Sequence, residues 1–346
     1  MIISRTPFRI SFFGGGTDYP NWYLKEGGAV LSTTIDKYVY ITCRHLPPFF
    51  KTRHRVVWSK IENVSRVDQI EHPAIREGLR YLGFDDEVGI DIHYQGDLPA
   101  RSGMGSSSAF AVGLVNALTA LHGERISKHE MALSAIHLEQ TLLKEAVGAQ
   151  DQVAAAYGGL NLIEFLRAGD IGVQPIILPP ARNAELEGSL MLFYSGISRY
   201  SSEIAAEMIA NIPNKHDSLK RMHDMVTQGC DILSGKGPLS DFGELLHEGW
   251  LNKRGLSTRV SNETIDGIYT RARKAGALGG KLLGAGESGF MMFFVPPQKF
   301  ESVRHALRDL LHVPFQFSSQ GSTIIHYDPE SISNGANRPS LKQVTA

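Results

Sequence analysis

The sequence predicts an α+β protein built from two domains with a cleft between them. Short apolar or alternating runs are interleaved with helical runs in both halves of the chain. A polar stretch with two prolines at 179–189 separates the halves, and 346 residues are enough for about two domains. We therefore expect an N-terminal domain at 1–182, a C-terminal domain at 183–330 and a polar tail at 331–346.

The first half of the chain alternates between strands and helices. Its apolar or alternating runs predict strands at 8–13, 29–42, 55–58, 88–94, 158–164 and 173–178. Apolar residues at amphipathic helical spacing predict helices at 104–122 and 127–143. Ser127 and Glu130 form a capping-box pattern at the start of the second helix. A shorter helix is expected to begin near Asp151 and to end at a pair of glycines.

The second half begins and ends with strands. Strands are predicted at 189–194, at 290–295 and within 314–326. Helices are predicted near 201–210, 215–233, 240–254, 261–275 and 298–311. A glycine-rich turn is expected at 276–289, before the strand at 290–295.

Composition argues against several classes of protein. Lys and Arg number 35 against 36 Asp and Glu, so a formal net charge of −1 gives no basic excess for nucleic acid. Cys43 and Cys230 have no metal-ligand spacing and fit a reducing cytosol. Arg5 and Arg9 make the N-terminus a poor signal peptide, and no apolar run approaches the ~18 residues that span a bilayer. We therefore expect a cytoplasmic protein with neither a nucleic-acid nor a membrane partner.

Residues 99–109, Pro-Ala-Arg-Ser-Gly-Met-Gly-Ser-Ser-Ser-Ala, form the most informative segment. Gly103 and Gly105 let the backbone bend where a side chain would clash, and three serines follow where a helix should begin. A helix start offers free N–H groups and a partial positive charge, so this pattern predicts a phosphate-binding turn. It is not a P-loop, because no Gly-Lys-Ser/Thr closes it. The alternative is a glycine turn with a serine N-cap and no ligand.

Two acidic residues stand out in predicted helices. Glu139 falls on the apolar stripe of its helix, where a carboxylate must be paired, hydrogen-bonded or bound to a metal. It is either part of a buried salt bridge or a Mg²⁺ ligand that faces the serine turn. Asp151 stands at the entrance of a short helix, where it serves either as an N-cap or as a general base.

Two further glycine-rich segments lie in opposite halves of the chain. Within residues 5–19, three consecutive glycines follow an apolar strand and let a ligand approach the backbone. There Asp18 can accept sugar hydroxyls and Arg9 can neutralise phosphate charge, unless the segment is a hairpin turn capped by Asp18. Residues 279–289 form the other glycine loop, which is weak evidence when taken alone.

Together, three motifs resemble those of the GHMP kinase family, in order and spacing across nearly the whole chain. They are Pro-Phe-Arg-Ile with Gly-Gly-Gly-Thr-Asp-Tyr within 7–19, the segment at 99–109, and Lys-Leu-Leu-Gly-Ala-Gly at 281–286. Glu139 and Asp151 are 12 positions apart (151 − 139), as are the Mg²⁺ ligand and the catalytic aspartate of galactokinase-like members. The resemblance implies the GHMP kinase architecture, with an N-terminal domain like domain 2 of ribosomal protein S5 and a ferredoxin-like C-terminal domain.

The resemblance also implies an ATP-dependent kinase that uses Mg²⁺, and it assigns roles to residues. Asp151 and Arg9 would be catalytic, and Ser107 and Glu139 would hold Mg²⁺. The substrate would lie against Gly15, Gly16, Thr17, Asp18, Tyr19 and Arg199. ATP would lie along Arg101, Ser102, Gly103, Met104, Gly105, Ser106, Ser107, Ser108, Gly284 and Gly286. The expected partners are ATP and a sugar phosphate, and the choice between monomer and homodimer stays open.

Within the family, the Gly-Gly-Gly-Thr-Asp form of the first motif and the segment 194–202 resemble one subgroup. Its members phosphorylate the anomeric hydroxyl of D-glycero-D-manno-heptose 7-phosphate, for GDP-heptose and surface polysaccharide synthesis. The alternatives are a galactokinase-like or fucokinase-like enzyme for an unphosphorylated sugar, and a non-catalytic sensor of sugar or ATP. Two stretches offer cations for a distal phosphate: one holds Arg199 and its neighbouring serines, and the other holds Arg44, His45, Lys51, Arg53, His54 and Arg55.

Overall fold

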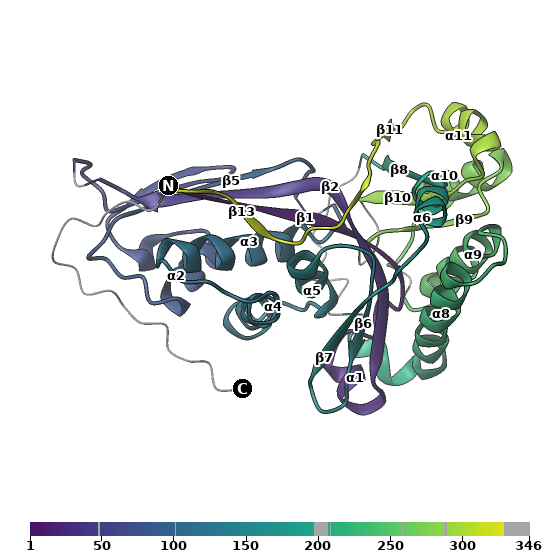
Figure 1. The fold of residues 1–346 in the computed structure, drawn as a ribbon, viewed down its shortest axis with the longest axis horizontal. Helices are drawn as coiled ribbons and strands as arrows, with labels where there is room; N and C mark the ends of the chain where they lie inside the picture. The colour runs from purple at the N-terminus through teal and green to yellow at the C-terminus, as the bar shows by residue number, and fades with distance from the viewer. Residues whose placement is uncertain are drawn as a thin grey trace.

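The computed structural model describes residues 1–47, 49–100, 102–196, 207, 209–257, 259–284, 286 and 289–328. Two sheets organise this part of the chain (Figure 1). The larger sheet carries helices on one face, and the smaller sheet lies with its own helices at one end of the molecule. The α+β class predicted from the sequence is confirmed.

The larger sheet is built on two long antiparallel strands. Its nine strands are β1 (Ile2–Phe13), β2 (Gly28–His45), β3 (His54–Val57), β4 (Ile61–Val64), β5 (Ile90–Gly96), β6 (Asn161–Phe165), β7 (Ile171–Pro175), β12 (Phe317–Ser318) and β13 (Thr323–Tyr327). Six of them follow the order β13-β1-β2-β5-β3-β4, while β6 and β12 pair with β2. Strand β1 begins earlier than predicted because Ser4 and Thr6 are polar yet buried, with their hydroxyls bonded to Gly113 and Ser322.

Helices α2 (Pro73–Tyr81), α3 (Ser106–Leu121), α4 (Lys128–Ile136) and α5 (Gln150–Tyr157) cover one face of this sheet (Figure 1). The predicted helix at 104–122 is therefore present, but the prediction that it is amphipathic was wrong. Helix α3 packs on β1 and β2 and is surrounded by the other three helices, so every residue from Ser108 to Ala120 is buried. The apolar stripe read from the sequence is part of a wholly apolar surface, as expected of a central helix.

The second predicted helix, at 127–143, is divided. Its capping box is confirmed, since Ser127 Oγ accepts from the Glu130 backbone and Glu130 accepts from the Ser127 backbone. Helix α4 ends at Ile136, and a π-helical turn follows over His137–Leu142. Such turns are frequent at functional sites, and this one contains Glu139.

The smaller sheet has the order β11-β8-β10-β9, with all neighbours antiparallel. Its strands are β8 (Leu190–Tyr194), β9 (Gly279–Leu282), β10 (Phe290–Phe294) and β11 (Leu311–His312). The helices of this half are α6 (Pro180–Glu187), α8 (His216–Ser234), α9 (Ser240–Arg254), α10 (Glu263–Ala275) and α11 (Phe300–Ala306). Taken in chain order, the strands lie fourth-first-third-second across the sheet, which is the ferredoxin-like arrangement the resemblance implied.

Several boundaries differ from those expected. The polar stretch at 179–189 holds helix α6, because Pro179 and Pro180 favour a helix start as well as a break. The turn expected at 276–289 contains strand β9, whose four residues are all buried. The segments β12 and β13, expected in the C-terminal domain, pair instead with β2 and β1 of the larger sheet. Helix α1 (Pro20–Glu26), helix α2 and strand β4 were not predicted from the sequence.

Two expectations from composition can be compared with the structure. Cys43, which is buried, and Cys230 are both free thiols. In the described part of the chain, no helix combines the length and the apolar character that crossing a membrane requires.

Candidate active site

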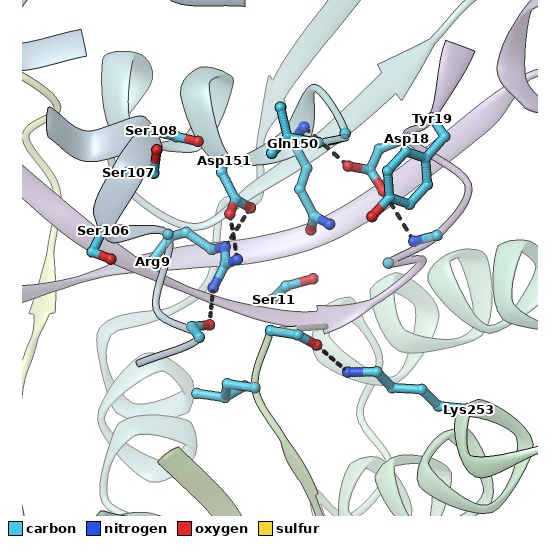
Figure 2. A pocket seen from close by; sticks show the side chains of 18 of the residues that line it. Arg9, Ser11, Asp18, Tyr19, Ser106, Ser107, Ser108, Gln150, Asp151 and Lys253 are labelled. Atoms are coloured by element: carbon cyan, nitrogen blue, oxygen red, sulfur yellow. Dashed lines mark hydrogen bonds and ion pairs between the residues drawn. The ribbon is translucent and has the colours of Figure 1, made fainter. Parts of the chain in front are cut away.

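A pocket of about 170 Å³ opens where the two halves of the chain meet (Figure 2). The first half contributes the end of β1, the glycine turn that follows it, and the starts of α3 and α5. The second half contributes one residue each from α8, α9 and β9, and the loop after β9. All three sequence motifs therefore reach one cavity.

The turn before α3 and the loop after β9 touch backbone to backbone. Gly103 and Gly105 have φ angles of 79° and 75°, in the left-handed region that favours glycine. A Cβ added at Gly103 would lie 2.3 Å from the carbonyl oxygen of Leu283, and one at Gly284 would lie 2.5 Å from the Cα of Gly103. No side chain fits between the two loops, so the second and third motifs need glycine where they meet.

The start of α3 faces the pocket with its three serines, Ser106, Ser107 and Ser108. Gly105 occupies the N-cap position and offers no side-chain cap. The alternative of a turn with a serine N-cap was therefore wrong. The first N–H groups of a helix lack partners within the helix and attract anions. The predicted phosphate-binding turn therefore opens into the cavity (Figure 2).

Strand β1 carries Arg9 into the pocket, and its pairing with β2 shifts register on both sides of this residue. Such irregularities re-aim side chains. Arg9 Nε and one terminal nitrogen donate to the two carboxylate oxygens of Asp151, at 2.6 and 2.5 Å (Figure 2). The other terminal nitrogen donates to the carbonyl of Gly103 at 2.9 Å. This bidentate pair fixes both side chains beside the phosphate-binding turn.

Asp151 is not an N-cap, so that alternative was wrong. Ala149 occupies the N-cap position of α5 and has no side-chain cap, while Asp151 is the second residue of the helix. Its side chain is 21% exposed, against 7% for Arg9. The carboxylate is thus held by the guanidinium and remains open to a ligand in the pocket.

Asp18 and Tyr19 line the same pocket from the turn after β1. Asp18 accepts hydrogen bonds from the backbone of Gly16 at 2.9 Å and of Gln150 at 3.2 Å (Figure 2). Burial raises the pKa of this carboxyl, and the nearby charge of Asp151 raises it further. Burial likewise raises the pKa of the Tyr19 hydroxyl, which therefore remains protonated. Asp18 both caps its turn and presents a buried acceptor to the cavity.

Glu139 lies directly behind the serine turn. Its carboxylate accepts from Ser107 Oγ at 2.5 Å and from Gln152 Nε2 at 2.5 Å, and the side chain is buried. Burial raises the pKa of Glu139 to about 7. Within the part of the chain that the structure describes, no Arg or Lys forms an ion pair with it, which argues against the salt-bridge alternative.

Four polar residues that line the pocket were given no role from the sequence: Ser11, Gln150, Lys253 and Lys281. Among the described residues, Ser11 Oγ and Gln150 Oε1 have no hydrogen-bond partner although both are buried, so both are available to a bound molecule. Lys253 and Lys281 bring positive charge from the second half of the chain. A lysine inside the apolar strand Gly279–Leu282 was a signal that could have been recognised in the sequence.

Five of the residues predicted to bind ligands lie outside the lining of this pocket, and one of them is Glu139, which is buried behind the serine turn. Thr17 is buried and its hydroxyl bonds the carbonyls of Gly14 and Ala29, so it holds the turn. Ser102 and Met104 are fully buried, and Gly286 packs on the backbone of residues 259–260. Gly15, Gly16, Gly103, Gly105, Gly284 and the three serines do line the pocket. Arg101 and Arg199 lie outside the described residues.

The basic run at 44–55, from the end of β2 to β3, was one of two sites considered for a distal phosphate, and the structure contradicts it. Arg44 pairs with Asp91 at 3.0 Å, and His54 is buried beside Asp86 at 3.3 Å. Cys43, next to Arg44, pairs with Ile2 of β1. Ile2 is seven strand positions from Arg9, or about 23 Å at the ~3.3 Å rise of a strand residue. These cations are therefore too far from the pocket to bind a substrate held there.

Comparisons with known proteins agree with this geometry. Residues 70–159 match the GHMP kinases N terminal domain, and residues 233–312 match the GHMP kinases C terminal domain. The chain is 30% identical over 331 residues to D-glycero-alpha-D-manno-heptose 7-phosphate kinase of Campylobacter jejuni, covering 89% of this chain and 93% of that protein. It is 26% identical to a galactokinase of Roseiflexus, covering 90% of this chain and 88% of that protein.

A solved structure shows the same fold. The crystal structure of a D-glycero-D-manno-heptose 1-phosphate kinase from Bacteroides thetaiotaomicron aligns with a TM-score of 0.75 and 26% identity, over 93% of this chain and 98% of that one. Both domains and the pocket between them thus define an ATP-dependent sugar kinase. The chain belongs to the GHMP kinase family.

Proposed function

We propose that this enzyme transfers the γ-phosphoryl group of ATP to the anomeric hydroxyl of D-glycero-D-manno-heptose 7-phosphate, giving the 1,7-bisphosphate and ADP. The product would serve GDP-heptose and surface polysaccharide synthesis in the cytoplasm. The observation that carries the proposal is the Asp151–Arg9 pair, held between the anion-binding start of α3 and the buried acceptor Asp18. The choice of sugar is supported by the 30% identity to a heptose 7-phosphate kinase.

Phosphoryl transfer requires mainly positioning and charge stabilisation, and the pocket supplies both. The start of α3 would hold the ATP phosphates through backbone N–H groups. The carboxylate of Asp151 would orient the sugar hydroxyl and accept its proton as the oxygen attacks phosphorus. The guanidinium of Arg9 would offset the charge that develops on the transferred group. Because Arg9 holds Asp151 through two hydrogen bonds, this one contact fixes both the carboxylate and the guanidinium in place.

The residues behind the serine turn fit a Mg²⁺ ion. Glu139 is a buried carboxylate with hydroxyl and amide partners only, and Ser107 brings its hydroxyl from the pocket wall. Mg²⁺ takes one or two protein oxygens together with phosphates and water, so Glu139 and Ser107 would hold it. A bound Mg²⁺ ion would neutralise part of the negative charge of the phosphates.

Glu139→Gln should separate the metal role from a structural one. Folding raises the pKa of Glu139 from 4.5 to about 7, so the folded state disfavours the carboxylate. Stability is therefore lost as pH rises from about 4.5 to 7, by roughly 3 kcal/mol at 1.36 kcal/mol per pKa unit. The neutral amide avoids this cost, so without Mg²⁺ at pH 8 the variant should melt at or above the wild-type temperature.

The same variant should need more Mg²⁺ for half-maximal activity. Mg²⁺ with ADP should raise the melting temperature of the wild type more than that of the variant, because the variant lacks a charged ligand. Glu124→Gln, the same chemical change in the exposed loop after α3, is the matched control. A lowered melting temperature with an unchanged Mg²⁺ titration would show that Glu139 has a structural role only.

Asp18→Asn is expected to weaken acceptor binding. The amide oxygen can still accept from the backbone of Gly16, and only the longer contact from the Gln150 backbone, at 3.2 Å, is lost, so the turn should survive. Loss of a charge-assisted hydrogen bond to a sugar hydroxyl costs roughly 1.5–3 kcal/mol, which is about one to two decades in KM. Steady-state kinetics should show this increase for the sugar and little change for ATP. An increase confined to the KM for ATP would contradict the assignment.

A panel of acceptors tests the proposed function. ATP consumption should be fastest with D-glycero-D-manno-heptose 7-phosphate and slow with free galactose, fucose or mannose. If an unphosphorylated sugar is preferred, the 26% identity to a galactokinase favours the galactokinase-like or fucokinase-like alternative. A downfield shift of the anomeric H1 signal in NMR spectra of the product, with a new coupling to phosphorus, would identify the phosphorylated position.

A further inference from the structure

Two lysines from the second half of the chain reach the pocket and are unused by the mechanism above. Lys253, in the last turn of α9, is only 7% exposed, and so is Lys281 of β9. Lys253 Nζ donates to the carbonyls of Leu282 at 3.1 Å and Gly284 at 2.5 Å. Lys281 Nζ donates to the carbonyl of Phe12 at 2.9 Å. Figure 2 shows Lys253 reaching toward the loop that meets the phosphate-binding turn.

These ammonium groups lack anionic partners. Among the residues that the structure describes, neither lysine forms an ion pair, and all the hydrogen bonds they make go to neutral carbonyls. The two carboxylates that line the pocket are already engaged, Asp151 by Arg9 and Asp18 by backbone N–H groups. An ammonium group has three donors, so each lysine keeps at least one for a ligand.

Burying uncompensated cations opposes folding, and a fold retains them where a ligand supplies the missing charge. The pocket wall brings Arg9, Lys253 and Lys281 together from three different elements. Of these three cations, only Arg9 has a carboxylate partner within the described part of the chain. The ligand that would balance this site is therefore an anion with several acceptor oxygens, and a phosphate group has both properties.

We propose that Lys253 and Lys281 form a phosphate subsite in the floor of the pocket, which binds a phosphate group of one substrate. The group is either the γ-phosphate of ATP or the distal phosphate of the acceptor, and in the second case the inference rests on the proposed function. Substrate phosphate and the two lysines would neutralise one another as the complex forms. The third motif would thus contribute a cation as well as its glycine turn.

The charges around the lysines give the subsite a measurable property. Burial, with the charge of Arg9 nearby, lowers the pKa of Lys253 to about 7. Burial and the charges of Lys253 and Arg9 lower the pKa of Lys281 as well. The other charged groups lining the pocket are Asp151 of α5 and Asp18 after β1. A phosphate dianion beside the lysines would restore their protonation, so binding at pH 8 should take up protons.

Isothermal titration calorimetry of the wild-type enzyme tests this without any substitution. Mg²⁺–AMP-PNP, Mg²⁺–ADP and the acceptor are titrated at pH 8 in two buffers with different ionisation enthalpies. Proton uptake with AMP-PNP but not with ADP assigns the subsite to the γ-phosphate. Uptake with a phosphorylated acceptor, and not with its unphosphorylated form, assigns it to the distal phosphate. Absence of uptake with every ligand would overturn the proposal.

Lys281→Met provides the kinetic test and leaves the carbonyl contacts of Lys253 in place. We expect the KM of one substrate to rise 10- to 100-fold and proton uptake to fall, while the variant melts at or above the wild-type temperature because an unpaired buried charge is removed. Lys274→Met, on the exposed face of α10, is the matched control. Lys253→Met provides a second test should Lys281→Met fail to fold.

The outcomes separate this inference from the proposed function. If the acceptor is an unphosphorylated sugar, the heptose assignment fails, yet the AMP-PNP titration still decides whether the lysines bind the γ-phosphate. If Lys281→Met changes neither KM nor proton uptake, the lysines are structural and the inference fails, whichever sugar is preferred.

Discussion

Asp151→Asn is expected to lower kcat by about two to four orders of magnitude, the usual contribution of a general base, while ATP binding stays within a few-fold of wild type. Asparagine preserves the shape of the side chain but cannot accept the proton of the sugar hydroxyl. It also leaves Arg9 with one acceptor in place of the bidentate carboxylate. Stopped-flow or coupled assays of ADP formation, combined with calorimetric titration of AMP-PNP, measure the two effects separately.

The matched control for this variant is Asp170→Asn, which makes the same chemical change at an exposed turn between β6 and β7. It should retain wild-type kcat. Since Asp151 is not the N-cap of α5, a loss of helix capping cannot explain a loss of activity. A kcat within tenfold of wild type for Asp151→Asn would show that the carboxylate is not the general base for the transfer.

Arg9→Gln should have an effect of similar size for a different reason. The substitution removes the cation that offsets charge on the transferred phosphoryl group, a role for which arginine contributes about 10³–10⁵ in kcat in other phosphoryl-transfer enzymes. It also leaves Asp151 without its two hydrogen bonds, next to the buried Asp18. We expect kcat to fall by at least about a hundredfold and the melting temperature to decrease, because breaking a largely buried pair leaves an uncompensated charge.

The double variant Arg9→Gln/Asp151→Asn tests whether the pair acts as a unit. Residues that share hydrogen bonds are not additive, so the double variant should lose little more activity than the worse single variant. Its melting temperature should recover, since the orphaned charge of Asp151 is removed. Arg167→Gln, at an exposed loop, is the control. Fully additive losses in kcat would show that the two residues act independently.

Much of the site could be predicted from the sequence because its chemistry depends on short, local patterns. Gly103 and Gly105 mark a turn that only glycine can make, and the serines that follow mark a helix start. Asp18 and Arg9 follow from the first motif, and Asp151 from its spacing to Glu139. Backbone sterics and local patterns were enough to find the glycine turn and the helix start, whereas the roles of the charged residues were what the resemblance to GHMP kinases implied.

Lys253 could not be recognised in the same way. Lys253 lies in the last turn of α9 beside Arg254, where cations are common because they complement the helix dipole. Its place in a pocket depends on the packing of α9 against β9, which no local pattern records. The pairing of Arg9 with Asp151, which are 142 residues apart, likewise required the fold.

The sequence by itself determined the class of fold and most strands and helices, since each follows from the period and composition of a short segment. It also contained the three motifs with their carboxylates, whose roles were implied by the resemblance to GHMP kinases. The tertiary structure alone decided which segments lie together. It buried α3 on all sides, returned β12 and β13 to the larger sheet, and paired Arg44 with Asp91, far from the pocket. The physical reason is that burial, strand pairing and charge compensation are relations between distant residues, whereas periodicity describes only neighbours.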